Sequence, residues 1–299
     1  MLSLRALADL ADRYRDDLDQ PVASIDIDGA VIATSDRPAI MGTLNLSRDS
    51  TYRDSIAVST ESAIRKARTM MAQGADIVDI GAESSTAAAA RVTAADQIAA
   101  LVPVIEAVTD AGVVVSAETY EPAVVRACLE AGARILNLTG TEHHEEIYRL
   151  AAEFDATVIL CYVGGANVRE ITDVEIDADP FPGLLDYFTA RVAEARSFGV
   201  DQIVIDPGMG FYYGNLVNPR VRVQHQTRVI TQSFRLRRLG LPICQALPHA
   251  FDIFEDQYRT AEGFFAVLAQ LGGVSLWRTH EVAQVRAVRE ATQFLGVEG

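Results

Sequence analysis

The chain has 299 residues, of which 49% are hydrophobic, and carries a formal net charge of −15 at pH 7. This length suits one (β/α)₈ barrel of about 250 residues with a short extension, or two small domains. The acidic balance argues against nucleic-acid partners, because phosphate backbones require a basic surface. No apolar run reaches the roughly 18 residues of a membrane span, and residues 1–20 are charged and helix-like, unlike a signal peptide. We therefore expect a cytoplasmic protein that binds neither nucleic acid nor membranes.

Cysteine, lysine and histidine usage limits the chemistry. Cys128, Cys161 and Cys244 are far apart and odd in number, so they match neither a disulfide framework nor a metal-ligand spacing. Each stands in an apolar stretch, which predicts buried structural thiols. Lys66 is the single lysine and lies on no predicted strand, which excludes a Schiff-base aldolase. A binuclear metallohydrolase with this fold needs histidines on the first strand, yet the first histidine in the chain is His143.

The N-terminal segment predicts a helix followed by a β-hairpin. Residues 23–27 and 30–34 alternate in polarity around Asp28-Gly29, a dipeptide typical of two-residue hairpin turns. We expect residues 1–37 to form an extension whose hairpin closes the N-terminal end of a barrel. Residues 38–299 would then form the barrel itself.

Short β-branched runs recur about every 30 to 40 residues and most are followed by Ala- and Glu-rich helical patterns, as in repeated βα units with a buried parallel sheet. The predicted strands are residues 39–44, 76–80, 113–117, 134–138, 157–162, 202–206, 242–246 and 274–278. The predicted helices include residues 60–73, 95–109, 122–131, 144–154, 182–198, 224–239, 261–271 and 281–295.

Eight such strands with covering helices predict an α/β fold, a single (β/α)₈ TIM barrel with an N-terminal helix and β-hairpin extension. The alternative is an open doubly wound sheet, which the repeat alone does not exclude. The Gly-rich dinucleotide fingerprint of that fold is missing after the first strand, where residues 45–49 read NLSRD. We therefore favour the barrel.

Two other segments can be interpreted from their charges and length. Arg235, Arg237 and Arg238 are predicted to form an exposed helix end, where positive charge complements the helix dipole. The long acidic segment 163–180 is either a lid over the barrel mouth or a solvated connection, and both alternatives stay open.

Polar side chains stand at or just past the ends of the predicted strands. In a barrel these positions converge on one mouth, where the active sites of this fold lie. A solvated strand end is the alternative for any single residue, but the whole set is hard to explain as packing. The set comprises Asn45, Asp49, Glu83, Ser84, Glu118, Thr119, Asn137, Tyr162, Asp206, His249, Arg278 and His280.

Five of these residues indicate the kind of ligand. Asn137 is flanked by apolar neighbours, so its amide should point into the mouth, unless it bridges backbone groups. Asp206 ends an apolar run and begins the turn DPGMGF, which predicts a rigidly held acceptor or an Asx-turn cap. Acceptors such as Glu118 and Asp206 suit a ligand edge with several N–H donors, for example a fused pyrimidinone with an exocyclic amine. Arg278, with His280 beside it, would supply donors for an anion.

Five motifs in order resemble the dihydropteroate synthase family. They are IMGTLNLSRDS (40–50), GADIVDIGAES (74–84), VSAETY (115–120), DPGMGF (206–211) and RTHEV (278–282). Each motif alone is weak, but their shared order at matching barrel positions is specific. The similarity extends from about residue 38 to the C-terminus.

The resemblance implies a TIM-barrel transferase of folate biosynthesis that joins 6-hydroxymethyl-7,8-dihydropterin diphosphate to p-aminobenzoate and releases pyrophosphate. It implies that Asp206 and Asn137 hold the pterin edge, with Glu118 at a position where the family has Asp. Phe211 and His249 would also bind the pterin substrate. A homodimer through outer helices is implied as well.

The resemblance also implies an anion end of the site. Asn45, and Asp49 with it, would hold Mg²⁺ and the diphosphate, with Arg278 and His280 as further anion ligands. Arg278 and the cation would offset charge on the departing pyrophosphate, and positioning would supply most of the rate. The implied catalytic residues are Asp206, Arg278 and Asp49.

Departures from the family pattern cluster around the amine acceptor. The family's Ser-Thr-Arg-Pro-Gly loop is SSTAA at residues 84–88, and its Ser-Arg-Lys segment is LPH at residues 247–249. Tyr162 stands where the family has histidine. Two alternatives therefore remain beside the folate reaction: a divergent pterin-dependent transferase with another nucleophile, and a non-catalytic pterin-binding paralogue.

Overall fold

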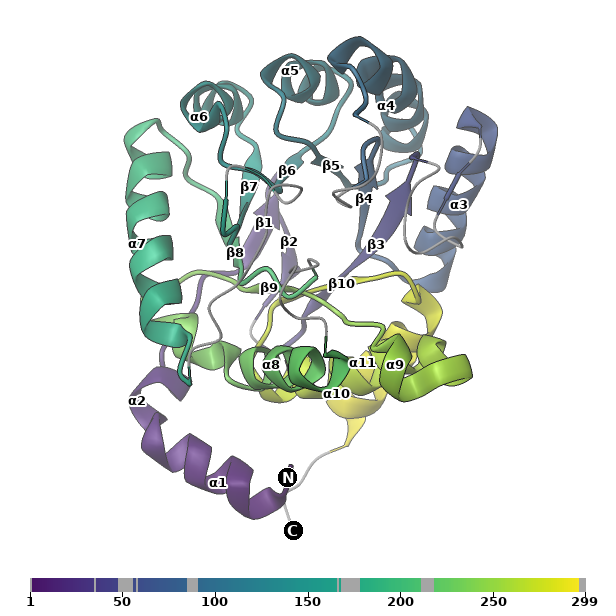
Figure 1. Ribbon diagram of the computed structural model, residues 1–299. Coiled ribbons are helices and arrows are strands. Elements are labelled where there is room, and N and C mark those ends of the chain that lie inside the picture. The colour runs from purple at the N-terminus through teal and green to yellow at the C-terminus, as the bar shows by residue number, and fades with distance from the viewer. Residues whose placement is uncertain are drawn as a thin grey trace.

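A computed structural model of the chain describes residues 2–34, 36–47, 56–57, 59–84, 91–165, 167, 178–210 and 218–295. Within these ranges a parallel sheet is surrounded by helices (Figure 1). Its strands are β3 (Ala39–Asn45), β4 (Ile77–Gly81), β5 (Val115–Glu118), β6 (Ile135–Leu138), β7 (Thr157–Cys161), β8 (Ile203–Asp206), β9 (Cys244–Ala246) and β10 (Leu276–Thr279).

The sheet closes on itself. Its strands are hydrogen-bonded in the order β8-β7-β6-β5-β4-β3-β10-β9. The two ends meet at a parallel bridge between Ile205 and Ile243, where the Ile205 N–H donates to the carbonyl oxygen of Pro242 over 3.0 Å. This contact distinguishes a barrel from an open doubly wound sheet, and it confirms the predicted (β/α)₈ TIM barrel.

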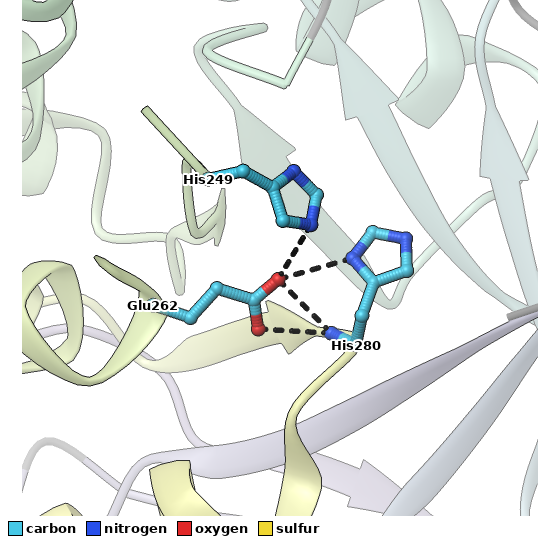
Figure 2. Close-up of side chains that lie close together, drawn as sticks. All are labelled: His249, Glu262 and His280. Carbon is cyan, nitrogen blue, oxygen red and sulfur yellow. Dashed lines mark hydrogen bonds and ion pairs between the residues drawn. The ribbon is translucent and has the colours of Figure 1, made fainter. Parts of the chain in front are cut away.

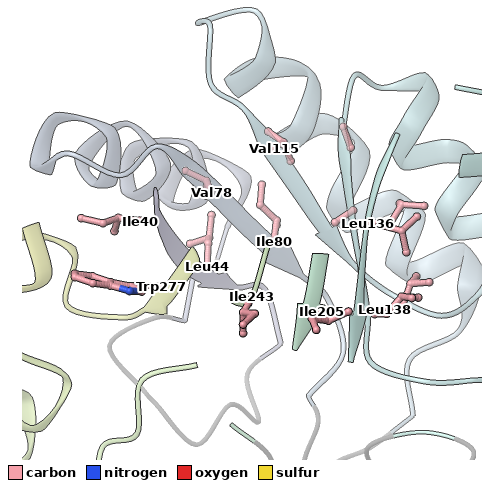
Figure 3. Close-up of a cluster of buried hydrophobic side chains, with 14 of the residues drawn as sticks. Ile40, Leu44, Val78, Ile80, Val115, Leu136, Leu138, Ile205, Ile243 and Trp277 are labelled. Carbon is pink, nitrogen blue, oxygen red and sulfur yellow. The ribbon is translucent and has the colours of Figure 1, made fainter. Parts of the chain in front are cut away.

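The pleat divides the strand residues into two apolar layers. Ile40, Val78, Leu136 and Trp277 face outward and pack with the helices in one large buried cluster (Figure 3). The alternate residues, such as Met41, fill the barrel interior in a second cluster. Since successive side chains of a strand point to opposite faces, each strand needs apolar residues on both. This explains the nearly continuous hydrophobic runs of the sequence.

The N-terminal hairpin packs under the barrel interior. Its strands β1 (Ile25–Ile27) and β2 (Ala30–Ala33) are antiparallel. Ile25, Ile27 and Ala33 are buried in the interior cluster with residues from the starts of the barrel strands. Asp28 at the turn pairs with Arg134, which precedes β6, over 3.0 Å. These contacts agree with a hairpin at the N-terminal end of the barrel, and the division at residue 37 stays a prediction.

The helices that cover the sheet follow the predicted segments closely. In α3 (Thr60–Gln73), Ser59 and Ser62 form a capping box and Gly74, with φ 103°, ends the helix, so local chemistry predicts both boundaries. None of the described helices combines the length and apolarity needed to cross a bilayer. The helices are α1 (Leu4–Arg13), α2 (Arg15–Leu18), α3 (Thr60–Gln73), α4 (Ala94–Thr109), α5 (Pro122–Glu130), α6 (His144–Glu153), α7 (Phe181–Ser197), α8 (Pro219–Thr231), α9 (Phe251–Phe254), α10 (Ala261–Leu271) and α11 (Val282–Phe294).

One predicted helix is in fact two elements. The segment 224–239 was expected to be continuous, but α8 begins at Pro219 and ends at Thr231, and a 3₁₀ helix, η2 (Ser233–Leu239), follows. The Asn218 side chain caps α8 by accepting from the Arg220 N–H over 3.0 Å. A further 3₁₀ helix, η3 (Glu255–Thr260), joins α9 to α10.

The prediction of an exposed arginine cluster was wrong for Arg235. Its side chain is 8% exposed and forms a bidentate pair with Asp179, both N–O distances being 2.7 Å. The guanidinium also lies over the rings of Tyr14 and Phe181, 3.9 and 4.4 Å from their centroids. Arg235 therefore links η2 to the residues at the starts of α2 and α7.

We expect Arg235→Met to lower the free energy of unfolding by about 2 kcal/mol, because it breaks a bidentate charged hydrogen bond and two cation–π contacts. Urea unfolding followed by circular dichroism measures the change. Arg196→Met, at an exposed position of α7, serves as the matched control and should stay within about 0.5 kcal/mol of the parent protein. Equal losses for both variants would contradict this role of Arg235.

Candidate active site

The barrel interior changes from apolar to polar part-way along the strands. Inward-facing residues of the lower layer are apolar, for example Ile77 and Val204. Two residues further along the same strands stand Asp79 and Asp206, buried at 1% and 0% exposure. Because the step of two keeps a side chain on the same face, the pleat directs both carboxyls into the mouth at the C-terminal ends of the strands.

Asn137 is hydrogen-bonded to Asp79, a residue that the sequence did not single out. The Asn137 amide nitrogen donates to Asp79 Oδ2 over 2.9 Å, and the Ser116 hydroxyl donates to Oδ1 over 2.6 Å. Burial raises the pKa of Asp79, while the nearby Arg278 and these hydrogen bonds oppose the rise. The sequence holds a signal for it, since Asp79 interrupts the apolar run of β4 from within the strand, away from its end.

Asp206 and Arg278 face each other in the mouth. Asp206 Oδ1 accepts from the Gly208 N–H over 2.8 Å, which confirms an Asx-type turn. Its buried Oδ2 lies 4.0 Å from an Arg278 Nη atom and accepts no conventional hydrogen bond from the described residues, although the weakly donating Cys244 thiol is near. Burial raises the pKa of Asp206, and Arg278 opposes it. Oδ2 is thus a buried acceptor with capacity for a ligand N–H.

Asn137 and Asp206 share this mouth, as the sequence predicts. They lie on β6 and β8, on either side of β7. Between them is Cys161, whose thiol lies 3.4 Å from Asn137 Oδ1 and whose backbone pairs in register with Asp206. All three cysteines are buried, as expected.

Glu118 enters the same layer from β5 and fits because Gly81 lies opposite. A Cβ at Gly81 would stand 2.8 Å from Glu118 Oε2, so a larger residue on β4 would displace the carboxyl. Burial first, and the neighbouring Asp79 second, raise the pKa of Glu118 to about 7, while Arg278 and a hydrogen bond from Thr139 act against the rise. This group is therefore poised to exchange a proton near neutral pH.

Arg278 is the cation next to these carboxyl groups. Burial acts to lower its pKa, but Asp206 and the other acidic neighbours outweigh this and hold the pKa above its ordinary value. Gly210 leaves the guanidinium room, since a Cβ there would stand 2.9 Å from an Nη atom. Arg278 stays charged throughout the accessible pH range.

His249 and His280 converge on Glu262, a second residue that the sequence reasoning missed (Figure 2). Their ring nitrogens lie 3.0 and 3.1 Å from Glu262 Oε1, which is fully buried at the start of α10. Burial alone would raise the pKa of Glu262, but the two histidines lower it well below its usual range. The detectable signal was a glutamate at the start of a mostly apolar helix, AEGFFAVLAQL.

Other members of the strand-end set serve structure or lie elsewhere. Glu83 accepts from the Tyr120 hydroxyl and the Val92 N–H, each over 3.0 Å, and so fixes the chain before α4. Tyr162 packs edge-on against Tyr187, with ring centroids 4.9 Å apart. Asn45 ends β3 at the mouth, half-buried. Asp49, Phe211 and most of the segment 163–180 lie outside the described residues.

The raised pKa of Glu118 predicts a pH dependence of stability. Because its folded pKa of about 7 exceeds the ordinary 4.5, the folded state binds more protons between these values, and the free energy of unfolding falls as the pH rises through them. We expect the free energy of unfolding to fall by about 2 kcal/mol more in the parent protein than in Glu118→Gln between about pH 5 and about pH 8.

Urea unfolding at the two pH values tests this expectation. Glu106→Gln makes the same chemical change at an exposed position of α4 and should leave the parental slope unchanged. Parallel pH profiles for the parent protein and Glu118→Gln would show that Glu118 titrates normally.

Known proteins are similar to this chain in sequence and in fold. A family profile described as pterin binding enzyme matches residues 41–280. A dihydropteroate synthase type-3 from Escherichia coli is 29% identical over 264 residues, which cover 86% of this chain and 99% of that protein. The crystal structure of dihydropteroate synthase from Thermus thermophilus in complex with 4-aminobenzoate has a TM-score of 0.76 and 28% identity, with 92% of this chain and 100% of that chain covered.

A longer relative shares only one of its parts with this chain. A probable bifunctional folylpolyglutamate synthase/dihydropteroate synthase from Halobacterium salinarum is 32% identical over 272 residues. The match covers 86% of this chain and 31% of that protein, so the chain spans less than a third of its length.

Proposed function

Because the chain belongs to the pterin-binding enzyme family, we propose that it is a transferase of the dihydropteroate synthase type. It joins 6-hydroxymethyl-7,8-dihydropterin diphosphate to an amine, p-aminobenzoate in the family, and releases pyrophosphate in folate biosynthesis. The observation that carries this proposal is the buried Oδ2 of Asp206, an acceptor that lies 4.0 Å from Arg278 and retains capacity for a ligand donor.

The acceptor side of the mouth matches the pterin edge. An aminopyrimidinone presents N–H donors from its ring and its exocyclic amine, and buried acceptors bind such an edge well because each would otherwise lack a partner. Asp206 supplies one acceptor and Glu118 a second. Asn137 takes part through its amide and also holds Asp79 in place. Phe211 and His249 complete the proposed set of pterin contacts.

The same charges suit the chemistry at the pterin methylene. The bond from the methylene carbon to the diphosphate oxygen breaks, pyrophosphate departs with the electron pair, and the amine nitrogen bonds to the carbon and then loses a proton. Arg278 and His280 act on the departing anion. Asp206 and Glu118 favour the positive charge that develops on the pterin. Holding the amine against the methylene supplies much of the rate.

Mg²⁺ suits the oxygen donors of Asn45, the last residue of β3, and of Asp49, four residues further along the sequence. The amide oxygen of Asn45 and the carboxylate of Asp49 are the hard ligands that this ion prefers. When bound, Mg²⁺ would neutralise charge on the diphosphate. Both the ion and the roles of these two residues are part of the proposal, as is a cytoplasmic location.

The identity of the amine is a separate question. The family's lysine position holds His249, whose imidazole is already engaged with Glu262 at 3.0 Å. An imidazole is a weaker hydrogen-bond partner for a pterin than an ammonium group. This observation favours, as a second candidate, a pterin-dependent transferase that uses a different nucleophile.

Calorimetric titration with the dihydropterin diphosphate and Mg²⁺ tests the pterin site directly. We expect Asp206→Asn to weaken binding on the order of 100-fold, because a charged acceptor for the pterin edge becomes a neutral amide. Asp186→Asn, at an exposed position of α7, is the matched control and should bind as the parent does. Parental affinity in Asp206→Asn would refute the proposed pterin site.

Pyrophosphate release in the same mixture separates the candidate functions. Release that depends on p-aminobenzoate identifies the folate reaction. Release with another amine only identifies the divergent transferase. Tight pterin binding without turnover of any amine identifies a non-catalytic binder and contradicts the proposed enzyme.

We also propose a homodimer through outer helices. Phe264, Val267 and Leu271 of α10 are 44%, 40% and 52% exposed. Their spacing places them on one face of the helix, and an apolar stripe of this kind on an outer helix suits a self-complementary contact between two copies.

Light scattering coupled to size exclusion tests the dimer. We expect the parent protein to elute with twice the mass of one chain, and Val267→Glu to shift towards the monomer because it buries a charge in the contact. Val31→Glu alters an exposed valine of the N-terminal hairpin and should remain dimeric. A parent protein that elutes as a monomer would overturn the proposal.

A further inference from the structure

The cluster of His249, Glu262 and His280 has the composition of a transition-metal site. The two histidines follow β9 and β10 at the barrel mouth, whereas the glutamate reaches them from α10 behind the strands (Figure 2). One potential ligand atom from each residue lies within 4.8 Å of the others. Two imidazoles and one carboxylate form a common ligand set for zinc and other first-row metals.

The spacing of the ligand atoms fits a metal ion. Bonds of about 2.0 to 2.2 Å at angles near 90 to 110° place two ligand atoms about 3.0 to 3.5 Å apart. Glu262 Oε1 lies 3.0 Å from His249 Nε2 and 3.1 Å from His280 Nδ1. The two imidazole nitrogens lie within 4.8 Å of each other, so these side chains would move closer together for one ion to contact all three atoms.

The other carboxylate oxygen of Glu262, Oε2, accepts hydrogen bonds from the end of β10 and the start of α11. Oε2 accepts from the backbone N–H groups of His280 and Glu281, over 2.9 and 3.1 Å, and from the Thr279 hydroxyl. Hydrogen bonds of this kind orient a metal-binding carboxylate and leave its second oxygen as the ligand. The backbone at the end of β10 thus aims Oε1 at the two imidazoles.

We propose that His249 Nε2, His280 Nδ1 and Glu262 Oε1 bind one divalent transition-metal ion, with Zn²⁺ as the best match. The nitrogen donors separate this site from the proposed Mg²⁺ ligands, which are all oxygens. The side chains of His249 and His280 are 19% and 20% exposed, so a fourth coordination position opens towards the mouth. The competing account is a carboxylate that accepts hydrogen bonds from the two imidazoles.

Metal binding can be measured on the whole chain without any pterin, so the result does not depend on the proposed reaction. Purified protein is stripped with a chelator and titrated with buffered Zn²⁺, and bound zinc is counted by plasma mass spectrometry. Replacement by Co²⁺ reports nitrogen ligation and coordination number through its visible absorption spectrum. We expect one ion per chain and a visible Co²⁺ spectrum typical of nitrogen ligation.

His249→Gln and His280→Gln should each weaken Zn²⁺ binding at least about tenfold and abolish the Co²⁺ spectrum. His143→Gln, at the N-cap of α6, is the matched control and should bind as the parent does. Circular dichroism verifies the fold of each variant, and neither His249 nor His280 caps a helix through its side chain. No stoichiometric binding in the parent, or equal binding in all four proteins, would overturn the site and favour the hydrogen-bonded account.

Discussion

Three carboxyl groups around one guanidinium dominate the barrel mouth, with Asp79 and Asp206 buried and Glu118 partly buried. Asp79, Glu118 and Asp206 each lose hydration, and burial is the largest cause of the raised pKa of each. Arg278 opposes the rise at all three, so it is the shared counter-charge. A buried carboxylate is tolerated only when charges and donors replace water. Besides Arg278, Ser116 and Asn137 supply such donors to Asp79.

The lower barrel supplies the rigidity that this arrangement requires. Its interior is filled by apolar side chains from the strands and by the hairpin residues Ile25, Ile27 and Ala33. Close packing there fixes the height and register of the strands. A slip of one residue would turn Asp79 or Asp206 outward into the apolar layer beneath the helices. The same pleat that fills the core thus delivers Asp79 and Asp206 to the mouth, two residues after Ile77 and Val204.

The sequence revealed the strands and most strand-end residues, because parallel barrel strands are short apolar runs and their ends converge. The sequence was less informative about site residues that lie inside a strand or a helix. Asp79 lies within β4 and Glu262 within α10, so a search of strand ends passed over both. Arg235 was misjudged because its partners, Asp179 and Tyr14, are distant in sequence, and no local pattern encodes such a contact. The pKa of Glu118 likewise depends on neighbours from other parts of the chain.

The two sides of the mouth differ in charge, and this difference can orient a ligand. Strands β4, β5, β6 and β8 carry the carboxyl and amide acceptors, whereas Arg278 lies on β10 and the two histidines follow β9 and β10. A ligand with N–H donors at one end and an anion at the other matches this division in one direction only. Reversal would place the anion among buried carboxyls, with like charges opposed in a medium that screens them poorly. Discrimination between the two ends thus arises from strand order in the barrel.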